Sequence, residues 1–307
     1  MTSMKGKLLL LMVLPVCSQA QESVRQQLVH EHEQEGLTLS YVNAGEIDSI
    51  DYGDRLYKTS QVKVESAGRL ADGAVSRDGE LIAFRLSYDH PYRNDLGVAH
   101  SDGSDLREYP GVDFPSSFCW SSDKSKLAVN AASQRRPHGE LLIVGLESEA
   151  TQDVDEGGYT TSQCWSPGDK EIVYGYGDSV RVFDLGAGKS REIAKGEDPT
   201  WSPDGKWIAF HSGDAYYVVQ PSGAGLTELF KQEGIRTGLW WSPDGSVVAY
   251  ISLGGKLPAS EHTFPFGPRQ LRVRRLADNS DDWILVEPDA PYVPSYQWVL
   301  PGASNTH

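Results

Sequence analysis

The stretch Trp201-Ser-Pro-Asp-Gly-Lys-Trp-Ile-Ala-Phe210 decides the fold, because it returns almost unchanged as Trp241-Ser-Pro-Asp-Gly-Ser-Val-Val-Ala-Tyr250. Pro-Asp-Gly is the chemistry of a tight turn: proline presets φ, aspartate bonds the backbone ahead of it, and glycine accepts a positive φ. The apolar run that follows in each copy is typical of a buried strand. Each copy therefore predicts two strands joined by a tight turn.

The same phrase recurs in weaker form along the chain. The copies follow one another at intervals close to the roughly 40–45 residues of a four-stranded propeller blade. Two more strands complete a unit, as in Tyr216–Val219 and Leu226–Phe230, and we name the four strands A to D in chain order. We expect the repeat tryptophans to pack between blades and the repeat aspartates to be turn residues rather than metal ligands. The weaker copies are Val75–Gly79, Trp120–Lys124, Trp165–Asp169 and Trp298–Gly302.

The two ends of the chain are expected to close the ring. Five units are complete, whereas the sixth has only an A strand, Ser295–Val299, before the sequence ends. Its missing strands are expected from the N-terminal side, at Leu37–Val42, Arg55–Thr59 and Gln61–Glu65, because pairing the two ends leaves no open sheet edge. The predicted fold class is thus all-β, a six-bladed β-propeller over residues 36–302 closed by N-/C-terminal strand exchange. Residues 303–307 are a predicted tail.

The first residues have the order of a secretory signal peptide. Two lysines precede an apolar run, Leu8–Val16, and small residues at Ser18–Ala20 suit cleavage before Gln21. Such an apolar run is too short to span a bilayer. Residues 1–20 are therefore a predicted signal peptide and 21–35 a short helix or flexible arm, in a periplasmic or secreted protein without membrane insertion. A lipid anchor on Cys17 is the alternative, although the bulky Val16 before it fits that pattern poorly.

The charge of the chain restricts its partners. It carries 43 acidic and 28 basic residues, a formal net charge of −15. Such a surface repels phosphate backbones and anionic lipids, which argues against nucleic acid and membrane binding. The expected partners are a periplasmic or extracellular protein, a peptide or a carbohydrate.

Cys119 and Cys164 each directly precede a repeat tryptophan, so they occupy equivalent places on A strands of neighbouring blades. Packed sheets lie about 10 Å apart, whereas a disulfide needs Cα atoms within about 7 Å. This spacing predicts two buried free thiols. A disulfide is the alternative, because the blades converge toward the axis.

The Trp-Ser-Pro-Asp-Gly phrase followed by Ile-Ala-Phe or Val-Ala-Tyr resembles the WD-like repeat of TolB-type β-propellers, over residues 75–302. Related blades occur in TolB of the Tol–Pal envelope system, in the propeller domains of prolyl-oligopeptidase-type peptidases and in oligogalacturonate lyases. TolB carries an extra α/β domain before its propeller, and we expect none here. The peptidases need a Gly-x-Ser-x-Gly elbow, which this sequence lacks. The resemblance implies the fold and leaves the activity open.

A ligand site is expected at the mouth of the central channel, where the B–C and D–A loops of a propeller meet on one face. The loop 253–269 is the longest of these connections, and long loops are usually binding loops, lids or disordered segments. Histidines follow the B strands and polar residues precede the A strands. The alternative is that the four histidines are ordinary surface-loop residues at unrelated distances from the channel axis. The candidate ligand-binding residues are His211, Arg236, His90, His138, Asp198, His262, Tyr159 and Gln163.

Two classes of function remain. The first is an exported non-catalytic recognition or scaffold propeller that binds an envelope protein, peptide or small ligand at the channel mouth. The second is a metal-dependent polysaccharide lyase or hydrolase resembling oligogalacturonate lyases, with the mouth histidines as base or ligands of a divalent metal. The sequence contains no nucleophile–base signature, which favours the first class, without catalytic residues, metal or other cofactor.

Overall fold

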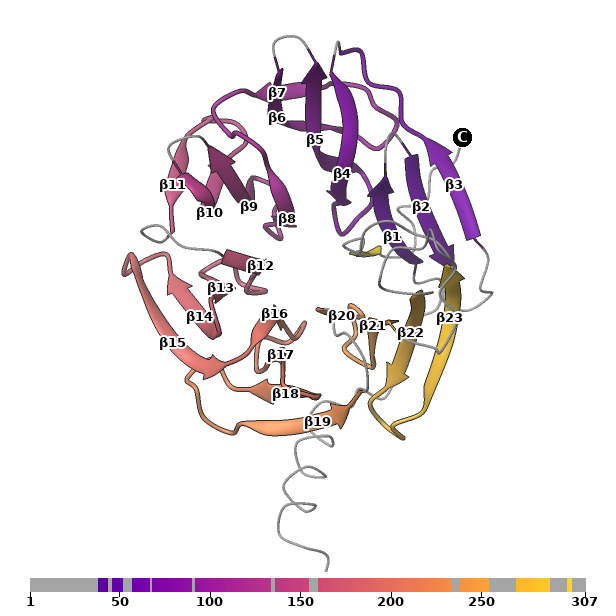
Figure 1. Ribbon diagram of the computed structural model, residues 1–307, viewed down its shortest axis with the longest axis vertical. Helices are drawn as coiled ribbons and strands as arrows, with labels where there is room; N and C mark the ends of the chain where they lie inside the picture. Colours follow the sequence, from indigo (N-terminus) through magenta and orange to yellow (C-terminus); the bar gives the residue numbers. More distant parts are fainter. Residues whose placement is uncertain are drawn as a thin grey trace, which may run out of the picture.

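The computed structural model describes an all-β chain (Figure 1). The predicted signal peptide, the arm over residues 21–35 and the tail over residues 303–307 lie outside the described residues. In the described part every regular element is a strand, and no helix there could cross a membrane. The structure describes residues 38–43, 46–51, 57–66, 68–89, 92–133, 136–154, 160–232, 238–253, 269–287 and 297–299.

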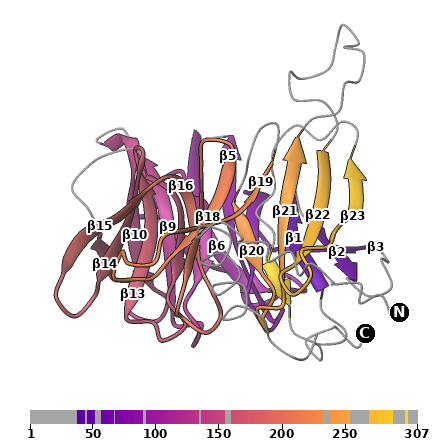
Figure 2. The ribbon, with the colours of Figure 1, turned by 90° about the horizontal axis from the view of Figure 1, so that it is seen from below.

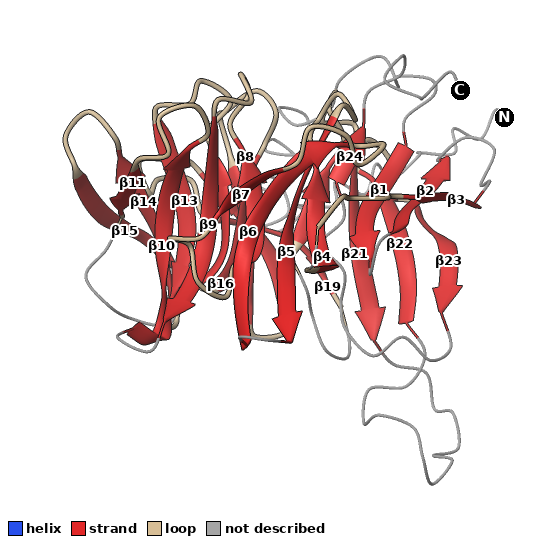
Figure 3. Cartoon of the chain, turned by 90° about the horizontal axis from the view of Figure 1, so that it is seen from above, coloured by secondary structure: helices blue, strands red, loops and turns tan. Residues whose placement is uncertain are grey.

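Strands β4 to β23 form five four-stranded antiparallel blades (Figure 3). The blades lie around a common axis, with strand A nearest the axis and strand D outside (Figure 1). The fold is therefore an all-β propeller, as predicted. Blade 1 comprises β4 (Arg69–Val75), β5 (Leu81–Asp89), β6 (Tyr92–His100) and β7 (Arg107–Tyr109), and blade 2 comprises β8 (Ser116–Trp120), β9 (Lys126–Ser133), β10 (Arg136–Gly145) and β11 (Thr151–Asp153). Blade 3 comprises β12 (Thr160–Trp165), β13 (Glu171–Tyr176), β14 (Ser179–Asp184) and β15 (Lys189–Lys195), and blade 4 comprises β16 (Glu197–Trp201), β17 (Ile208–Ser212), β18 (Ala215–Val219) and β19 (Thr227–Lys231). Blade 5 comprises β20 (Leu239–Trp241), β21 (Val247–Leu253), β22 (Arg269–Arg275) and β23 (Asp281–Glu287).

The strands run between two faces of the molecule (Figure 2). Because neighbouring strands of a blade are antiparallel, the A–B and C–D turns lie on one face, and the B–C and D–A connections lie on the other. We call the first the turn face and the second the mouth face.

The serine of the repeat phrase, whose role was not predicted, holds the A–B turn together. In blade 4 the buried Ser202 hydroxyl donates to Asp204 Oδ1 at 2.7 Å and accepts the Trp207 amide at 3.0 Å. The fifth residue of the phrase has a positive φ in all five blades, 71° at Gly205 and 60° at Lys124, which explains why glycine is the commonest choice there. The repeat aspartates are turn residues, as predicted.

The repeat tryptophans connect neighbouring blades. The indole N–H of Trp120 donates to the carbonyl oxygen of Ala74 at 3.2 Å, and that of Trp165 donates to the carbonyl oxygen of Cys119 at 3.1 Å. Each acceptor belongs to the A strand of the preceding blade. The same interfaces hold the core, which is a set of apolar clusters between adjacent blades. The predicted packing role of these indoles is confirmed.

The remaining strands lie beside blade 1. They pair in the order β24 (Gln297–Val299), β1 (Thr38–Asn43), β2 (Glu46–Asp51) and β3 (Tyr57–Gln61), and β1 also joins β4 through the pair Val42 and Gly73. The prediction of a strand at Gln61–Glu65 was wrong, because residues 62–65 are not in a strand, and the strand at Glu46–Asp51 was missed. Its apolar residues, Ile47 and Ile50, are separated by polar ones, so the local pattern is weak.

Both Cys119 and Cys164 are free thiols in the structure, as predicted, but they are partly rather than fully buried. The Trp165 amide donates to the Cys119 sulfur at 3.3 Å. A hydrogen bond with Cys164, together with burial, raises the pKa of the Cys119 thiol. The same hydrogen bond lowers the pKa of the Cys164 thiol.

Titration of the denatured, unreduced protein with a thiol reagent is expected to find both thiols free. The reason is that both cysteines are free in the structure and the Cys119 sulfur accepts the Trp165 amide. Finding no free thiol at these two positions would show instead that the A strands of blades 2 and 3 are bridged.

Candidate functional site

Four of the eight predicted site residues lie in the described part of the chain, and the other four do not. His90, Tyr159, Arg236 and His262 lie outside the described residues. His138 lies in β10, where the pairing with β9 is irregular, rather than in a B–C loop as expected. His211, Asp198 and Gln163 can be placed with their side chains.

Asp198 and His211 are in contact on the mouth face. Asp198 lies in β16 and His211 near the end of β17, and the His211 Nε2 and Asp198 Oδ2 atoms are 3.2 Å apart. The other carboxylate oxygen of Asp198 accepts a hydrogen bond of 2.7 Å from the Ser162 hydroxyl, on β12 of the preceding blade. The three side chains form one chain of contacts, Ser162–Asp198–His211, across a blade boundary.

The backbone explains why Asp198 can reach both partners. The pairing of β16 with β17 shifts between Glu197 and Thr200, and Asp198 within this bulge has a φ of 50°. A register shift recurs in the A–B pair of blades 1 to 4, and Ser117, at the equivalent place in blade 2, has a φ of 53°. The bulge is thus a feature of the repeat. In blade 4 the bulge places the Asp198 carboxylate in contact with both His211 and Ser162.

Asp198 remains ionised in this site. Burial alone would raise the pKa of its carboxyl, but the hydrogen bonds from His211 and Ser162 outweigh burial and lower the pKa. Its side chain is 25% exposed and that of His211 is 12% exposed, so water screens the pair only in part. An ionised aspartate that accepts a hydrogen bond from one imidazole nitrogen fixes the orientation of the ring. The other ring nitrogen is then oriented for a ligand.

Gln163, predicted to lie at the channel mouth, is instead buried against the neighbouring blade. It is 6% exposed on β12, and its amide nitrogen donates to the carbonyl oxygens of Ser117 at 2.7 Å and Ala128 at 3.1 Å. Both acceptors belong to blade 2. The structure thus gives this side chain a contact between blades.

Blade 1 carries a charged cluster toward the mouth face that was not predicted from the sequence. The Arg93 guanidinium lies 4.1 Å from the centre of the Tyr88 ring and forms an ion pair of 2.9 Å with Asp95. The Tyr88 hydroxyl donates to Glu108 at 2.6 Å. Burial raises the pKa of Asp95; the charge of Arg93 opposes this, while those of Glu108 and Asp113 add to it.

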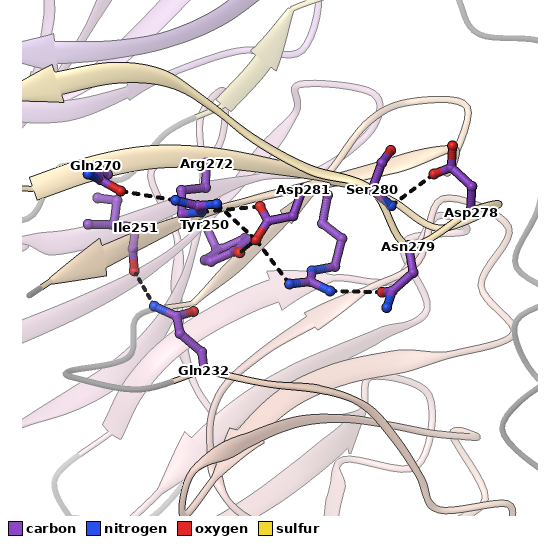
Figure 4. Close-up of polar contacts among 10 residues, drawn as sticks. Gln232, Tyr250, Ile251, Gln270, Arg272, Asp278, Asn279, Ser280 and Asp281 are labelled. Carbon is purple, nitrogen blue, oxygen red and sulfur yellow. Dashed lines mark hydrogen bonds and ion pairs between the residues drawn. The ribbon is translucent and has the colours of Figure 1, made fainter. Parts of the chain in front are cut away.

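A second charged cluster lies within blade 5 (Figure 4). Asp281 accepts hydrogen bonds from Arg272 at 3.2 Å, Arg274 at 3.0 Å and Tyr250 at 2.8 Å. Arg274 also lies 4.1 Å from the centre of the Phe230 ring, on the D strand of blade 4. These polar groups bond one another, which makes the cluster a structural connection between blades 4 and 5. In the described part of the chain, no group of three or more histidine, cysteine, aspartate or glutamate side chains is placed to hold a metal ion.

No family model matches the sequence. Among solved structures, the chain superposes on TolB from Acinetobacter baumannii with a TM-score of 0.64 and 16% identity, over 86% of this chain and 67% of that one. A protein from Agrobacterium tumefaciens whose structure carries the TolB name gives a TM-score of 0.61 at 14% identity, over 84% and 91% of the two chains.

Two further solved structures of other kinds of protein are similar in fold. A chain of the nidogen/laminin complex gives a TM-score of 0.61 at 8% identity, over 86% of this chain and 99% of that one. An oligogalacturonate lyase solved with manganese gives 0.53 at 12% identity, over 80% and 77%. Identities this low bear on the fold alone. The chain has a propeller fold similar to the propeller domains of TolB.

Proposed function

We propose that the protein is an exported, non-catalytic recognition propeller, periplasmic or secreted, that binds an envelope protein, a peptide or a small ligand at the mouth face. The observation that carries this proposal is the Ser162–Asp198–His211 chain of contacts. It combines an ionised, partly buried carboxylate with an oriented imidazole on the face where the connections between strands vary most. Binding residues on a rigid scaffold usually lie on such connections.

The order of these three contacts favours binding over catalysis. A serine nucleophile needs its hydroxyl proton taken by a base, and histidine is the usual base. Here the Ser162 hydroxyl donates to Asp198, and Asp198 stands between Ser162 and His211. The serine therefore lacks the contact with imidazole that would activate it.

We further propose that the ring has six blades closed by the two ends of the chain. The strand order β24–β1–β2–β3 has the A-to-D pattern of blades 1 to 5. The Trp298 indole donates to the carbonyl oxygen of Trp240 at 2.8 Å, as the indoles of Trp120 and Trp165 do toward their preceding blades. β24 also contacts both β20 and β4, the A strands of blades 5 and 1.

A metal-dependent lyase or hydrolase acting on a polysaccharide is the second candidate. Asp198 and His211 are two side chains of the kinds that bind divalent metals, and they already touch. The oligogalacturonate lyase that shares the fold was solved with manganese. Stoichiometric metal in the purified protein, together with cleavage of a uronic-acid polymer that is lost in His211→Ala, would support this candidate over the recognition propeller.

Panning a peptide library on the full chain tests the proposed function. Peptides enriched on the parent protein are expected to lose at least about tenfold in affinity for His211→Gln and for Arg236→Ala. Glutamine retains an N–H for Asp198 but removes the imidazole, so the fold should be unaffected. Measured by calorimetry, unchanged affinity in both variants would contradict the proposal.

The control lies on the turn face. Asp204→Ala removes the carboxylate that accepts the Ser202 hydroxyl and the Lys206 amide. It is expected to lower the free energy of unfolding by about 1–2 kcal/mol while leaving peptide affinity unchanged. The two kinds of variant therefore separate binding from stability.

A further inference from the structure

Two exposed aromatic rings touch one another on the mouth face of blade 1. In the described part of the chain, the large hydrophobic side chains that are exposed are Tyr92 at 73%, Phe114 at 37% and Leu226 at 59%. The ring centres of Tyr92 and Phe114 are 5.9 Å apart, with the planes inclined at 51°. Tyr92 begins strand C, and Phe114 lies in the connection between blades 1 and 2, so both belong to the mouth face. Leu226 lies in a C–D turn on the opposite face.

The backbone holds Phe114 in this exposed position. Its φ is 47°, a left-handed conformation that is unusual for a bulky residue. Its amide donates to the Asn94 carbonyl oxygen at 3.0 Å, and the carbonyl oxygen of Asp113 accepts the Ala132 amide at 3.0 Å. The connection is therefore tied to blade 1 on one side and to blade 2 on the other. Strain of this kind persists only where surrounding contacts impose it, and it is frequent at ligand-binding sites.

The surroundings of the two rings are acidic. Asp89 pairs with Tyr92 across β5 and β6, and Asp113 directly precedes Phe114. The charge of Asp113 also acts on the buried Asp95. Two guanidiniums offset part of this charge, since Arg69 pairs with Asp89 and Arg93 pairs with Asp95. With Glu108 included, this part of blade 1 has four carboxylates (Asp89, Asp95, Glu108 and Asp113) and two guanidiniums (Arg69 and Arg93). The excess of negative charge favours a cationic partner.

We propose that Tyr92 and Phe114 dock an extended segment of a partner protein in which a lysine or arginine stands next to an aromatic or proline ring. A further ring can pack against the exposed faces of such a pair, and an aromatic face also attracts a cation. The inference rests on the proposed function, because it names the class of partner that the mouth face takes. Blade 1, which carries the rings, and blade 4, which carries Asp198 and His211, lie on opposite sides of the axis (Figure 1).

The test measures binding of labelled synthetic peptides to the full chain by fluorescence anisotropy. The probe is acetyl-Lys-Trp-Lys-Pro-amide, with the acidic acetyl-Glu-Trp-Glu-Pro-amide and the ring-free acetyl-Lys-Ala-Lys-Ala-amide for comparison. Only the probe is expected to bind, and added salt is expected to weaken it. Tyr92→Ser and Phe114→Asn should each lower its affinity at least tenfold. Asparagine tolerates a positive φ, so Phe114→Asn removes the ring without adding strain.

Leu226→Ser is the matched control, since it removes an exposed apolar side chain from the turn face and should leave affinity unchanged. Equal binding of the acidic peptide, binding of a neutral oligosaccharide in place of the probe, or unchanged affinity in Tyr92→Ser and Phe114→Asn would each overturn the inference. If peptide binding depends on His211 and Arg236 but not on the rings, the inference fails and the proposed function stands. The reverse pattern would reject the Asp198–His211 site and keep the ring pair.

Discussion

Deleting residues 295–307 is expected to destabilise the whole propeller, by more than the roughly 3–5 kcal/mol that truncation of one buried tryptophan usually costs. The deletion removes Trp298, which is 2% exposed, and the strand β24 that pairs with β1. It thereby opens the proposed ring and exposes the edge of β1. A loss of this size is a large part of the total stability of a typical domain, so the melting temperature should fall by many degrees.

Two smaller changes at the same end of the chain serve as controls for this deletion. Trp298→Phe keeps a large ring but removes the indole N–H that bonds the Trp240 carbonyl oxygen, and it should cost about 1 kcal/mol. Deleting only residues 303–307 should leave stability unchanged. If the protein without residues 295–307 melts within a degree or two of the parent, the ring does not close through β24.

Asp281→Asn is expected to lower the free energy of unfolding by about 2–4 kcal/mol, which urea denaturation would measure. The carboxylate joins Arg272, Arg274 and Tyr250, and its loss leaves two guanidiniums without a counter-charge. The side chains of Arg272, Arg274 and Asp281 are 24%, 12% and 22% exposed, so removing one charge costs more than at a surface pair. For the same reason, added salt should change the effect little.

Asp278→Asn serves as the control, because Asp278 lies in the adjacent turn and its carboxylate bonds Ser280 of the same turn. Its effect on stability is expected to be much smaller than that of Asp281→Asn. A loss below about 0.5 kcal/mol for Asp281→Asn would place the cluster among ordinary surface ion pairs.

Part of the candidate site could be predicted from the sequence, and part could not. Asp198 and His211 were both predicted, because the strand order brings the start of an A strand and the end of a B strand to the same face. The hydrogen bond between Asp198 and Ser162 was not predicted, because Ser162 belongs to the preceding blade. The local sequence around either residue does not determine how far apart the two blades lie. The Arg93 cluster and the Tyr92–Phe114 pair were missed because they depend on the strand register within blade 1 and on the path of the connection to blade 2.

The sequence by itself determined the propeller and its turns, because those depend on residues within a few positions of one another. Trp201-Ser-Pro-Asp-Gly205 carries its own turn chemistry and is followed by its own apolar strand, so the repeat can be recognised without any distant contact. Only the tertiary structure decided how the blades meet: the indole of Trp165 on the Cys119 carbonyl oxygen, the amide of Gln163 on blade 2, and the left-handed backbone of Phe114. These features depend on the separation and angle of neighbouring sheets, which the packing of all the intervening side chains sets together.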